Sequence, residues 1–280
     1  MRNLLNAFDK LACPNCQAVG MRLITDAGRG DEPVPASGYA VCEHCAMRYP
    51  IAEHILDLAP HRAYPLTLAG RSNLSPFAPT LYENVWRPRS LSLLSGEAFP
   101  PARELALLNE WAHVAPDELV LDVGTSTGFY ARGLARTCAT AQIVALDQAR
   151  GMLRTARTLA RREGFKNLIY LRAFAQALPF ADAGVDVIVC GGSLNEFDSM
   201  TDALRELRRV LKTDGRLVVM SLLAASSPQG KLAQQFFGIS GIRFPTRAGF
   251  NTLAQEAGLR VVAQQAYGCV LFSRLVKCTE

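Results

Sequence analysis

The residues best suited to chemistry follow a hydrophobic run at 119–124, in the stretch LVLDVGTSTGFYARGLAR. An acid, Asp122, stands two residues before Gly124, and Gly128 follows four residues later. Dinucleotide-binding turns carry three glycines spaced G-x-G-x-x-G, which let a pyrophosphate approach a helix N-terminus. The spacing here does not fit that fingerprint, and a carboxylate at Asp122 would repel a pyrophosphate. We therefore expect this turn to hold a ligand with a cationic end.

A second acid follows the next hydrophobic run. Asp147 lies near the end of QIVALDQ, nineteen positions after Gly128. In nucleotide-binding α/β folds an acid at this place binds ribose hydroxyls through both oxygens. A ligand with a ribose, an adenine and a cationic tail but no phosphate is S-adenosylmethionine. Either acid alone is also typical of a strand-end cap, so the prediction rests on their combination at neighbouring strand ends.

Cysteine supplies a second candidate site. Four of the eight cysteines form two C-x-x-C pairs, Cys13 with Cys16 and Cys42 with Cys45. Two such pairs are typical of a tetrahedral zinc site, whose four thiolates leave no open position for catalysis. The alternatives are two disulfides or a thioredoxin-like pair. We expect structural zinc (Zn2+), since a domain of about 60 residues needs such a staple.

These residues must be positioned by a larger fold. Short runs rich in Val, Ile and Leu occur at 119–124, 142–147, 168–173, 185–192 and 215–222, separated by helical patterns. This alternation predicts a doubly wound α/β fold with a parallel sheet. Residues 260–277 instead read as a hairpin, which would place one antiparallel strand in the sheet. The helix expected at 100–114 begins with proline.

Composition and punctuation divide the chain into parts. Residues 1–60 are expected to form a zinc ribbon, 61–99 a linker and capping segment, and 100–280 the α/β domain. The segment 60–80 contains four prolines and reads as a linker, and the polar stretch TDAGRGDEPVPASG reads as a hairpin-like loop. After the second cysteine pair, MRYPIAEHILDLAP is expected to supply one final strand. The sequence lacks a transmembrane run and a signal peptide, so we expect a cytoplasmic protein.

Several motifs together resemble a known family. LDVGTSTG, VALDQARGMLRTAR, AQALPFADAGVDVIVCGGSLNEF and RELRRVLKTDGRLVVMSL occur in the order found in class I S-adenosylmethionine-dependent methyltransferases, close in style to the quinone-biosynthesis group. The resemblance implies a seven-stranded sheet with one antiparallel strand. The N-terminal cysteines add a resemblance to zinc-ribbon ribosomal-RNA guanine methyltransferases and to bacterial and plastid methyltransferases of unclear substrate.

The resemblance also implies site residues. Asp122 and the neighbouring backbone would hold the methionine end, Asp147 the ribose, and Gln148 and Met152 the adenine. The full set of implied cofactor-binding residues is Asp122, Gly124, Thr125, Gly128, Asp147, Gln148, Met152, Phe174, Ala175, Gln176 and Gly191. Two positions depart from the family pattern. Phe174 stands where an acid is usual, and Ser126 replaces a frequent glycine.

Candidate catalytic residues follow the fourth strand, in SLNEFDS. Asn195 is expected to hydrogen-bond the methyl acceptor and Glu196 to take its proton. The alternative is that Glu196 and Asp198 only favour the start of the next helix. His113 is more typical of a helix cap than of a base, and Cys190 lies in an apolar run without an activating group.

The acceptor is less constrained. The segments 82–91 and 224–246 are expected to flank the mouth of the site, the second as a lid lined by Phe236, Phe237, Ile239 and Phe244. An apolar lid favours a small or lipid-like acceptor, although core packing would explain the same side chains. The rival function is methylation of a ribosomal or transfer RNA base, because Arg150, Arg154, Arg157, Arg161 and Arg162 form a basic stripe that could meet phosphates together with Lys166. A solvated helix face would explain the same stripe. Against RNA, the ribbon is acidic, with five basic and seven acidic residues. A third possibility is a catalytically silent module that binds a protein partner through the ribbon.

Overall fold

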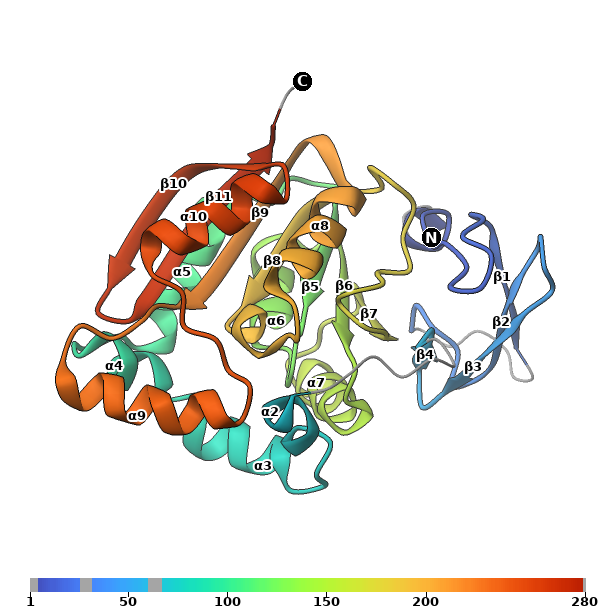
Figure 1. Ribbon diagram of the computed structural model, residues 1–280. Coiled ribbons are helices and arrows are strands. Elements are labelled where there is room, and N and C mark those ends of the chain that lie inside the picture. The colour runs from blue at the N-terminus through green and yellow to red at the C-terminus, as the bar shows by residue number, and fades with distance from the viewer. Residues whose placement is uncertain (1–4, 26–31, 60–66, 279–280) are drawn as a thin grey trace.

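The computed structural model describes residues 5–25, 32–59 and 67–278 (Figure 1). Its strands form one continuous sheet in the order β1-β2-β3-β4-β7-β6-β5-β8-β9-β11-β10. The last seven strands of that order are the α/β domain. They are β5 (Leu119–Val123), β6 (Gln142–Asp147), β7 (Leu168–Arg172), β8 (Val185–Gly191), β9 (Leu211–Leu222), β10 (Leu259–Tyr267) and β11 (Val270–Lys277).

The direction of these strands confirms the predicted fold class. The pairs β7–β6, β6–β5, β5–β8 and β8–β9 are parallel. Strand β11 is antiparallel to both β9 and β10, which makes the terminal hairpin expected at 260–277. The chain thus has the α/β sheet with one antiparallel strand that the resemblance implies.

Helices cover both faces of this sheet (Figure 1). One layer is α5 (Pro101–Ala112), α6 (Phe129–Thr137) and α7 (Arg150–Arg162), and the other is α8 (Met200–Val210) and α10 (Arg247–Glu256). Val120 packs toward the first layer, whereas Leu121 packs toward the second. Because side chains alternate along a strand, these apolar runs bury both faces of the sheet.

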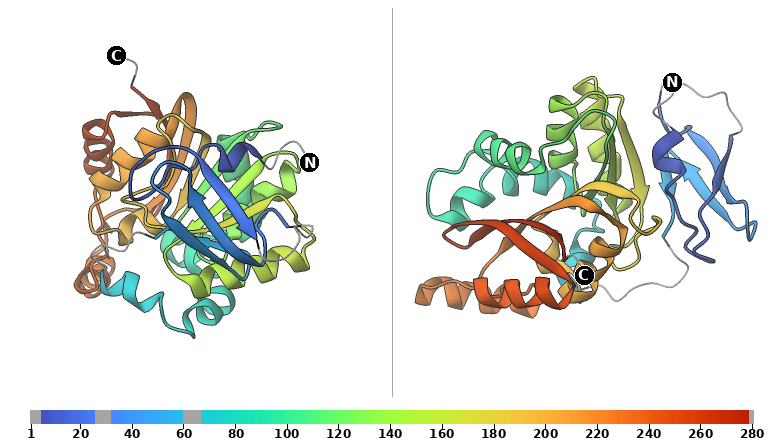
Figure 2. Two further views of the ribbon diagram at one scale, coloured as in Figure 1. Left: turned by 90° about the vertical axis from the view of Figure 1, so that its right-hand side faces the viewer. Right: turned by 90° about the horizontal axis from the view of Figure 1, so that it is seen from above.

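The cysteine-rich N-terminal region extends the same sheet. It comprises α1 (Leu5–Phe8), β1 (Met21–Thr25), β2 (Ser37–Cys42), β3 (Arg48–Ala52) and β4 (Ile55–Asp57). The sequence predicted one strand after the second cysteine pair, but two form, because Glu53 and His54 turn the chain with φ of 56° and 62°. Strand β4 then pairs in parallel with β7, from Ile55 opposite Tyr170 to Asp57 opposite Arg172. The right-hand view of Figure 2 shows this region at one edge of the molecule.

The segment 67–97, which we call the cap, is helical where a linker was expected. It contains α2 (Leu68–Ser72), α3 (Ala78–Leu81), the π-helical turn η1 (Tyr82–Trp86) and α4 (Ser90–Ser95). Thr67 caps α2 by accepting a hydrogen bond from the amide of Gly70, and Pro79 lies in the first turn of α3, where no N–H is needed. Residues 60–66 of the expected linker, and 26–31 of the expected hairpin loop, lie outside the described residues.

Two further elements complete the α/β domain. The short 3-10 helix η2 (Ser193–Glu196) follows β8, and α9 (Pro228–Ile239) follows β9. Within the described ranges, no helix is long and apolar enough to cross a lipid bilayer.

Candidate cofactor cleft and cysteine cluster

The glycine loop at 124–128 joins β5 to α6 and lies against the end of β6. The amides of Gly124 and Thr125 donate to the carbonyl of Leu146, at 2.9 and 3.0 Å. Gly124 has φ of 69°, and a Cβ there would lie 2.4 Å from the Ser193 hydroxyl, so only glycine fits. Ser126 adopts φ of 50°, a left-handed conformation that explains why glycine is frequent at this position in the resembling family. The loop is therefore fixed between β6 and η2.

The two predicted acids lie beneath this one loop. Asp147 accepts from the amides of Ser126 and Ala149, at 2.9 and 2.8 Å. Asp122 accepts from the Thr125 hydroxyl at 2.6 Å and from the amide of Ala131 at 3.0 Å. Burial raises the pKa of both carboxyls, that of Asp122 to about 7, and the charge of Asp147 adds to the shift at Asp122. Two neighbouring buried carboxylates favour a ligand that carries positive charge and hydroxyl donors.

The residues expected around the adenine follow β6 and β7. The Ser126 hydroxyl lies 3.5 Å from the sulfur of Met152. The amide of Ala173 donates to the carbonyl of Asp147, so Phe174, Ala175 and Gln176 continue from the same point. Phe174 and Ala175 are buried and Gln176 is half-buried. Gln148 presents its carbonyl to the Nε of Arg172, at 3.0 Å.

Packing explains why position 191 is a glycine, a reason that the sequence did not reveal. A Cβ at this position would lie 2.5 Å from the ring of Tyr130, so the absence of a side chain lets that ring pack against β8. The hydroxyl of Tyr130 donates to Glu104 at 2.6 Å, and Glu104 pairs with Arg87 of the cap at 2.5 Å. The glycine therefore supports a buried polar network next to the cleft.

The cap contributes residues that sequence reasoning did not select. The Tyr82 hydroxyl is hydrogen-bonded to the side chain of Ser126, and burial raises its pKa to about 12. Glu83 accepts from the Thr127 hydroxyl at 2.5 Å and from Arg132 at 3.3 Å. The sequence placed 82–91 beside the mouth, but these contacts span more than 40 positions and leave no local pattern. The cap thus closes over the glycine loop.

The amide of Asn195 is fully engaged by the protein backbone, contrary to its predicted role. Its Nδ2 donates to the carbonyls of Leu222 and Arg243, at 2.8 and 2.5 Å, and its Oδ1 accepts from the amide of Leu222 at 2.8 Å. The side chain is completely buried. Asn195 therefore ties η2 to the end of β9 and is not placed to bind an acceptor.

Glu196 has the properties of a proton acceptor. Its carboxylate accepts from Nδ2 of Asn73 in the cap at 3.0 Å, and its carbonyl accepts from the Thr67 hydroxyl at 3.0 Å. Burial raises the pKa of Glu196 to about 7, the hydrogen bond from Asn73 opposes that rise, and the charge of Asp147 adds to it. A carboxyl with a pKa near neutrality exchanges protons readily at physiological pH.

Two other candidates behave as the sequence indicated. His113 ends α5 in a left-handed conformation with φ of 41°. Cys190 is fully buried in β8, and burial raises the pKa of its thiol to about 12, so it is not a nucleophile.

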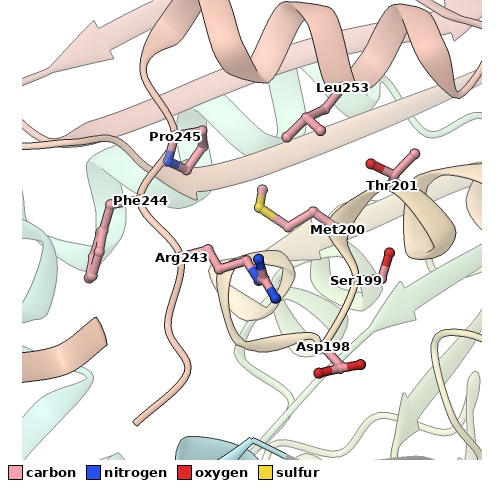
Figure 3. A pocket seen from close by; sticks show the side chains of 8 residues that line it. All are labelled: Asp198, Ser199, Met200, Thr201, Arg243, Phe244, Pro245 and Leu253. Carbon is pink, nitrogen blue, oxygen red and sulfur yellow. The ribbon is translucent and has the colours of Figure 1, made fainter. Parts of the chain in front are cut away.

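An open cavity of about 610 Å³ lies behind η2 (Figure 3). The start of α8 and the segment after α9 form its walls, and the amide of Arg243 donates to the carbonyl of Asn195 at 2.9 Å. The lining residues are Asp198, Ser199, Met200, Thr201, Arg243, Phe244, Pro245 and Leu253. In Figure 3, Arg243 and Asp198 lie below Met200, and Leu253 lies above it. The first of the lining residues, Asp198, stands two positions after Glu196, and Glu196 itself does not line the cavity.

The four predicted metal ligands come together in the ribbon. The sulfur atoms of Cys13, Cys16, Cys42 and Cys45 all lie within 4.8 Å of one another. The separations Cys13–Cys45 and Cys16–Cys42 are 3.7 and 3.6 Å, close to the roughly 3.8 Å expected between thiolates around tetrahedral zinc. The donor set fits zinc, and each cysteine pair is turned by a left-handed residue, Gln17 or Ala46.

Three arginines of the basic stripe on α7 form ion pairs with acids of the ribbon. Arg157 forms a bidentate pair with Glu32, at 2.9 and 2.6 Å. Arg154 pairs with Glu53 at 2.5 Å, and Arg150 lies 3.6 Å from Asp57. The acidic balance of the ribbon is thus complementary to α7. Arg150, Arg154 and Arg157 therefore contribute to the contact between α7 and the ribbon, whereas Arg161, Arg162 and Lys166 are exposed.

Helix α9 was predicted as a lid, with core packing as the alternative. No residue of α9 is buried, and Phe236 and Ile239 are 68% and 75% exposed. The core-packing alternative is therefore wrong for this helix. Its outward apolar side chains remain without a partner among the described residues.

Comparisons with known proteins find a methyltransferase domain in this chain. Residues 121–219 match the family model described as a methyltransferase domain. An uncharacterised chloroplastic methyltransferase of Arabidopsis thaliana is 28% identical over 227 residues, covering 77% of this chain and 62% of that protein. A ubiquinone/menaquinone biosynthesis C-methyltransferase of Legionella pneumophila is 35% identical over 113 residues, covering 40% of this chain and 45% of that protein. This chain therefore spans less than two thirds of the length of either relative.

A solved structure supports the fold. The crystal structure of a SAM-dependent methyltransferase from Aquifex aeolicus superposes with a TM-score of 0.54 at 21% identity, covering 73% of this chain and 99% of that one. The match of residues 121–219 therefore identifies a methyltransferase domain within this chain, and the superposition and strand order agree with the α/β fold that the resemblance implies.

Proposed function

We propose that this protein transfers a methyl group from S-adenosylmethionine to a small, lipid-like acceptor. The observation that carries the proposal is the pair of buried carboxylates, Asp122 and Asp147, beneath one glycine loop. When bound, S-adenosylmethionine supplies a methyl group on a positively charged sulfur. Asp147 would hold the ribose hydroxyls, and Asp122 would offer negative charge near the cationic end.

The chain's own residues orient the reactants and exclude water. The glycine loop is held by Leu146 on one side and by Tyr82 and Glu83 of the cap on the other. Alignment of reacting groups can supply about 7–11 kcal/mol of barrier reduction. We assign Glu196 as the base that takes a proton from the acceptor, since its pKa of about 7 suits that task.

A lipid-like acceptor is favoured over RNA by the charges and the exposed side chains. Arg150, Arg154 and Arg157 of the basic stripe pair with Asp57, Glu53 and Glu32, whereas apolar side chains of α9 are exposed. The Legionella relative is named for ubiquinone and menaquinone synthesis, which makes a prenylated hydroquinone a suitable test acceptor.

Two measurements test the proposal separately. Isothermal titration calorimetry with S-adenosylmethionine should give one binding site, which Asp147→Ala weakens strongly. Radiolabelled S-adenosylmethionine should then transfer its methyl group to a prenylated hydroquinone, but not to ribosomal RNA. Absence of cofactor binding by the folded wild type would refute the function as a whole. Binding with transfer only to RNA would refute the acceptor class alone.

A further inference from the structure

The outer surface of the cap and of α9 carries an unusual number of exposed apolar side chains. Large hydrophobic residues are exposed along both segments, and Phe77 is 81% exposed. We define the apolar face by six of them: Phe77, Leu81, Trp86, Leu232, Phe236 and Ile239. Large exposed apolar patches on soluble proteins mark interaction sites.

The two segments that carry these side chains lie next to one another. Helix α9 and the cap lie along the same lower edge in Figure 1 and in the left-hand view of Figure 2. The amide of Ala69 in α2 donates to the carbonyl of Ser240 just after α9, at 3.0 Å. Within α9, Leu232, Phe236 and Ile239 are spaced four and three residues apart, so they share one side of the helix. The cap's inner side faces the glycine loop, so the apolar face points outward.

The unpaired charges described in these two segments are positive. Arg71, Arg89 and Lys231 are exposed next to it, and none forms an ion pair within the described residues. The only acids in 67–97 and 224–247 are Glu83 and Glu97, which pair with Arg132 and Arg103. The segments therefore present apolar side chains flanked by uncompensated positive charge.

We propose that this face binds an anionic lipid surface. Amphipathic helices lie in the membrane interface when apolar residues on one side are flanked by Lys and Arg, and Trp is favoured at that depth. Anionic lipid matches both features, since the apolar side chains would enter the interface and the cations would meet the headgroups, whereas nucleic acid would match only the positive charge. The binding goes beyond methyl transfer and does not depend on it. It would bring a lipid-dissolved acceptor to the edge of the cap that closes the cleft.

The test uses the full-length protein and vesicles of phosphatidylcholine with 30% phosphatidylglycerol, without cofactor. The wild type should co-sediment with these vesicles, and less so with pure phosphatidylcholine or at high salt. Phe77→Ser with Phe236→Ser should weaken binding at least about tenfold, and Arg71→Glu with Lys231→Glu should do the same. The matched controls are Val262→Ser and Arg260→Glu, at exposed positions of β10, and should bind like the wild type.

Three results would overturn the proposal. The wild type would fail to bind anionic vesicles, or the double serine variant would bind them unchanged. Alternatively, light scattering would show a dimer that the double serine variant splits, which would make a second copy of the chain the occupant. Thermal melting of each variant shows whether it is folded, and calorimetry with S-adenosylmethionine separates failure here from failure of the proposed enzyme activity.

Discussion

The ribbon and the cap are both additions to the α/β domain, but they differ in how many of their side chains are paired within the protein. The ribbon joins the sheet through β4 and pairs its acids with arginines of α7. The cap uses Tyr82 and Glu83 to hold the glycine loop on its inner side, but leaves aromatic and basic side chains exposed outside. In Figure 1 the ribbon lies at the right and α9 at the lower left. The difference indicates that the ribbon supports the α/β domain, whereas the outer side of the cap and of α9 is exposed, as the proposed lipid binding requires.

Removing the metal site should have the largest effect, because the ribbon shares its core with the α/β domain. Leu11, Leu56 and Phe180 belong to one apolar cluster that crosses between the two. Cys45→Ser should abolish zinc binding and lower the melting temperature by at least about 10 °C, since structural zinc contributes several kcal/mol to folding. Zinc content and calorimetry measure both quantities. Cys269→Ser, outside the cluster, is the control. A folded, metal-free Cys45→Ser protein with unchanged melting temperature would show that the ribbon needs no zinc.

The second largest effect should be on cofactor affinity at the proposed site beneath the glycine loop. Asp147→Asn keeps the shape of the side chain but removes the charge beneath the glycine loop. Hydrogen bonds to a charged group contribute about 1.5–3 kcal/mol, so affinity for S-adenosylmethionine should fall about 10- to 100-fold. Asp202→Asn at an exposed position of α8 is the control for calorimetry. Equal affinity of both variants would exclude Asp147 from the cofactor site.

Glu196, the proposed base, contacts Asn73 of the cap, and its pKa leads to an expected pH dependence of activity. Because its pKa is about 7, activity should rise as pH increases through 7, when the carboxylate becomes able to accept a proton. Glu196→Gln should remove that rise and reduce kcat about 100-fold or more, while cofactor affinity stays near the wild-type value.

The same group makes a prediction about stability. A raised pKa in the folded state means that stability is lost as pH rises from about 4.5 toward 7, so Glu196→Gln should be at least as stable as the wild type at pH 8. A less stable variant would indicate a structural role. Asn73→Ala should shift the activity profile to higher pH, since Asn73 lowers the pKa of Glu196.

Local patterns were sufficient for the sheet, the cysteine cluster and the two acids. Strands β5 to β8 coincide with apolar runs in the sequence. Asp122 and Asp147 lie at or near the ends of β5 and β6. Asn195 was misjudged because its polar side chain is used to bind the backbone of Leu222 and Arg243, which lie 27 and 48 positions away. Tyr82, Glu83 and Asn73 were missed for the same reason. Contacts made only after folding leave no spacing in the sequence.

A smaller effect tests whether the ribbon supports the cleft at a distance. Asp57 in β4 pairs with Arg172 at 2.9 Å, and Arg172 donates to the carbonyl of Gln148 beside Asp147. Asp57→Asn should release Arg172 and weaken binding of S-adenosylmethionine about two- to fivefold. This fold-change is of the size expected for losing one partly exposed ion pair. Glu53→Gln removes a ribbon charge that pairs with Arg154 and does not contact Arg172, so it is the matched control. Equal affinities would confine the ribbon's role to stability.

The smallest effect is the direct test that α7 is an internal interface. Glu32 accepts two hydrogen bonds from Arg157, and both side chains are largely shielded from solvent. The Arg157 charge lowers the pKa of Glu32, so this pair stabilises the fold above the unfolded pKa near 4.5 and loses its effect as pH falls. A double-mutant cycle of Glu32→Gln and Arg157→Gln should give a coupling of about 1 kcal/mol at pH 7 in urea denaturation. The coupling should weaken as pH falls below 4.5. If it is absent at pH 7 and Arg157→Gln instead weakens RNA binding, the arginines of α7 serve an external partner, and the contrast between ribbon and cap fails.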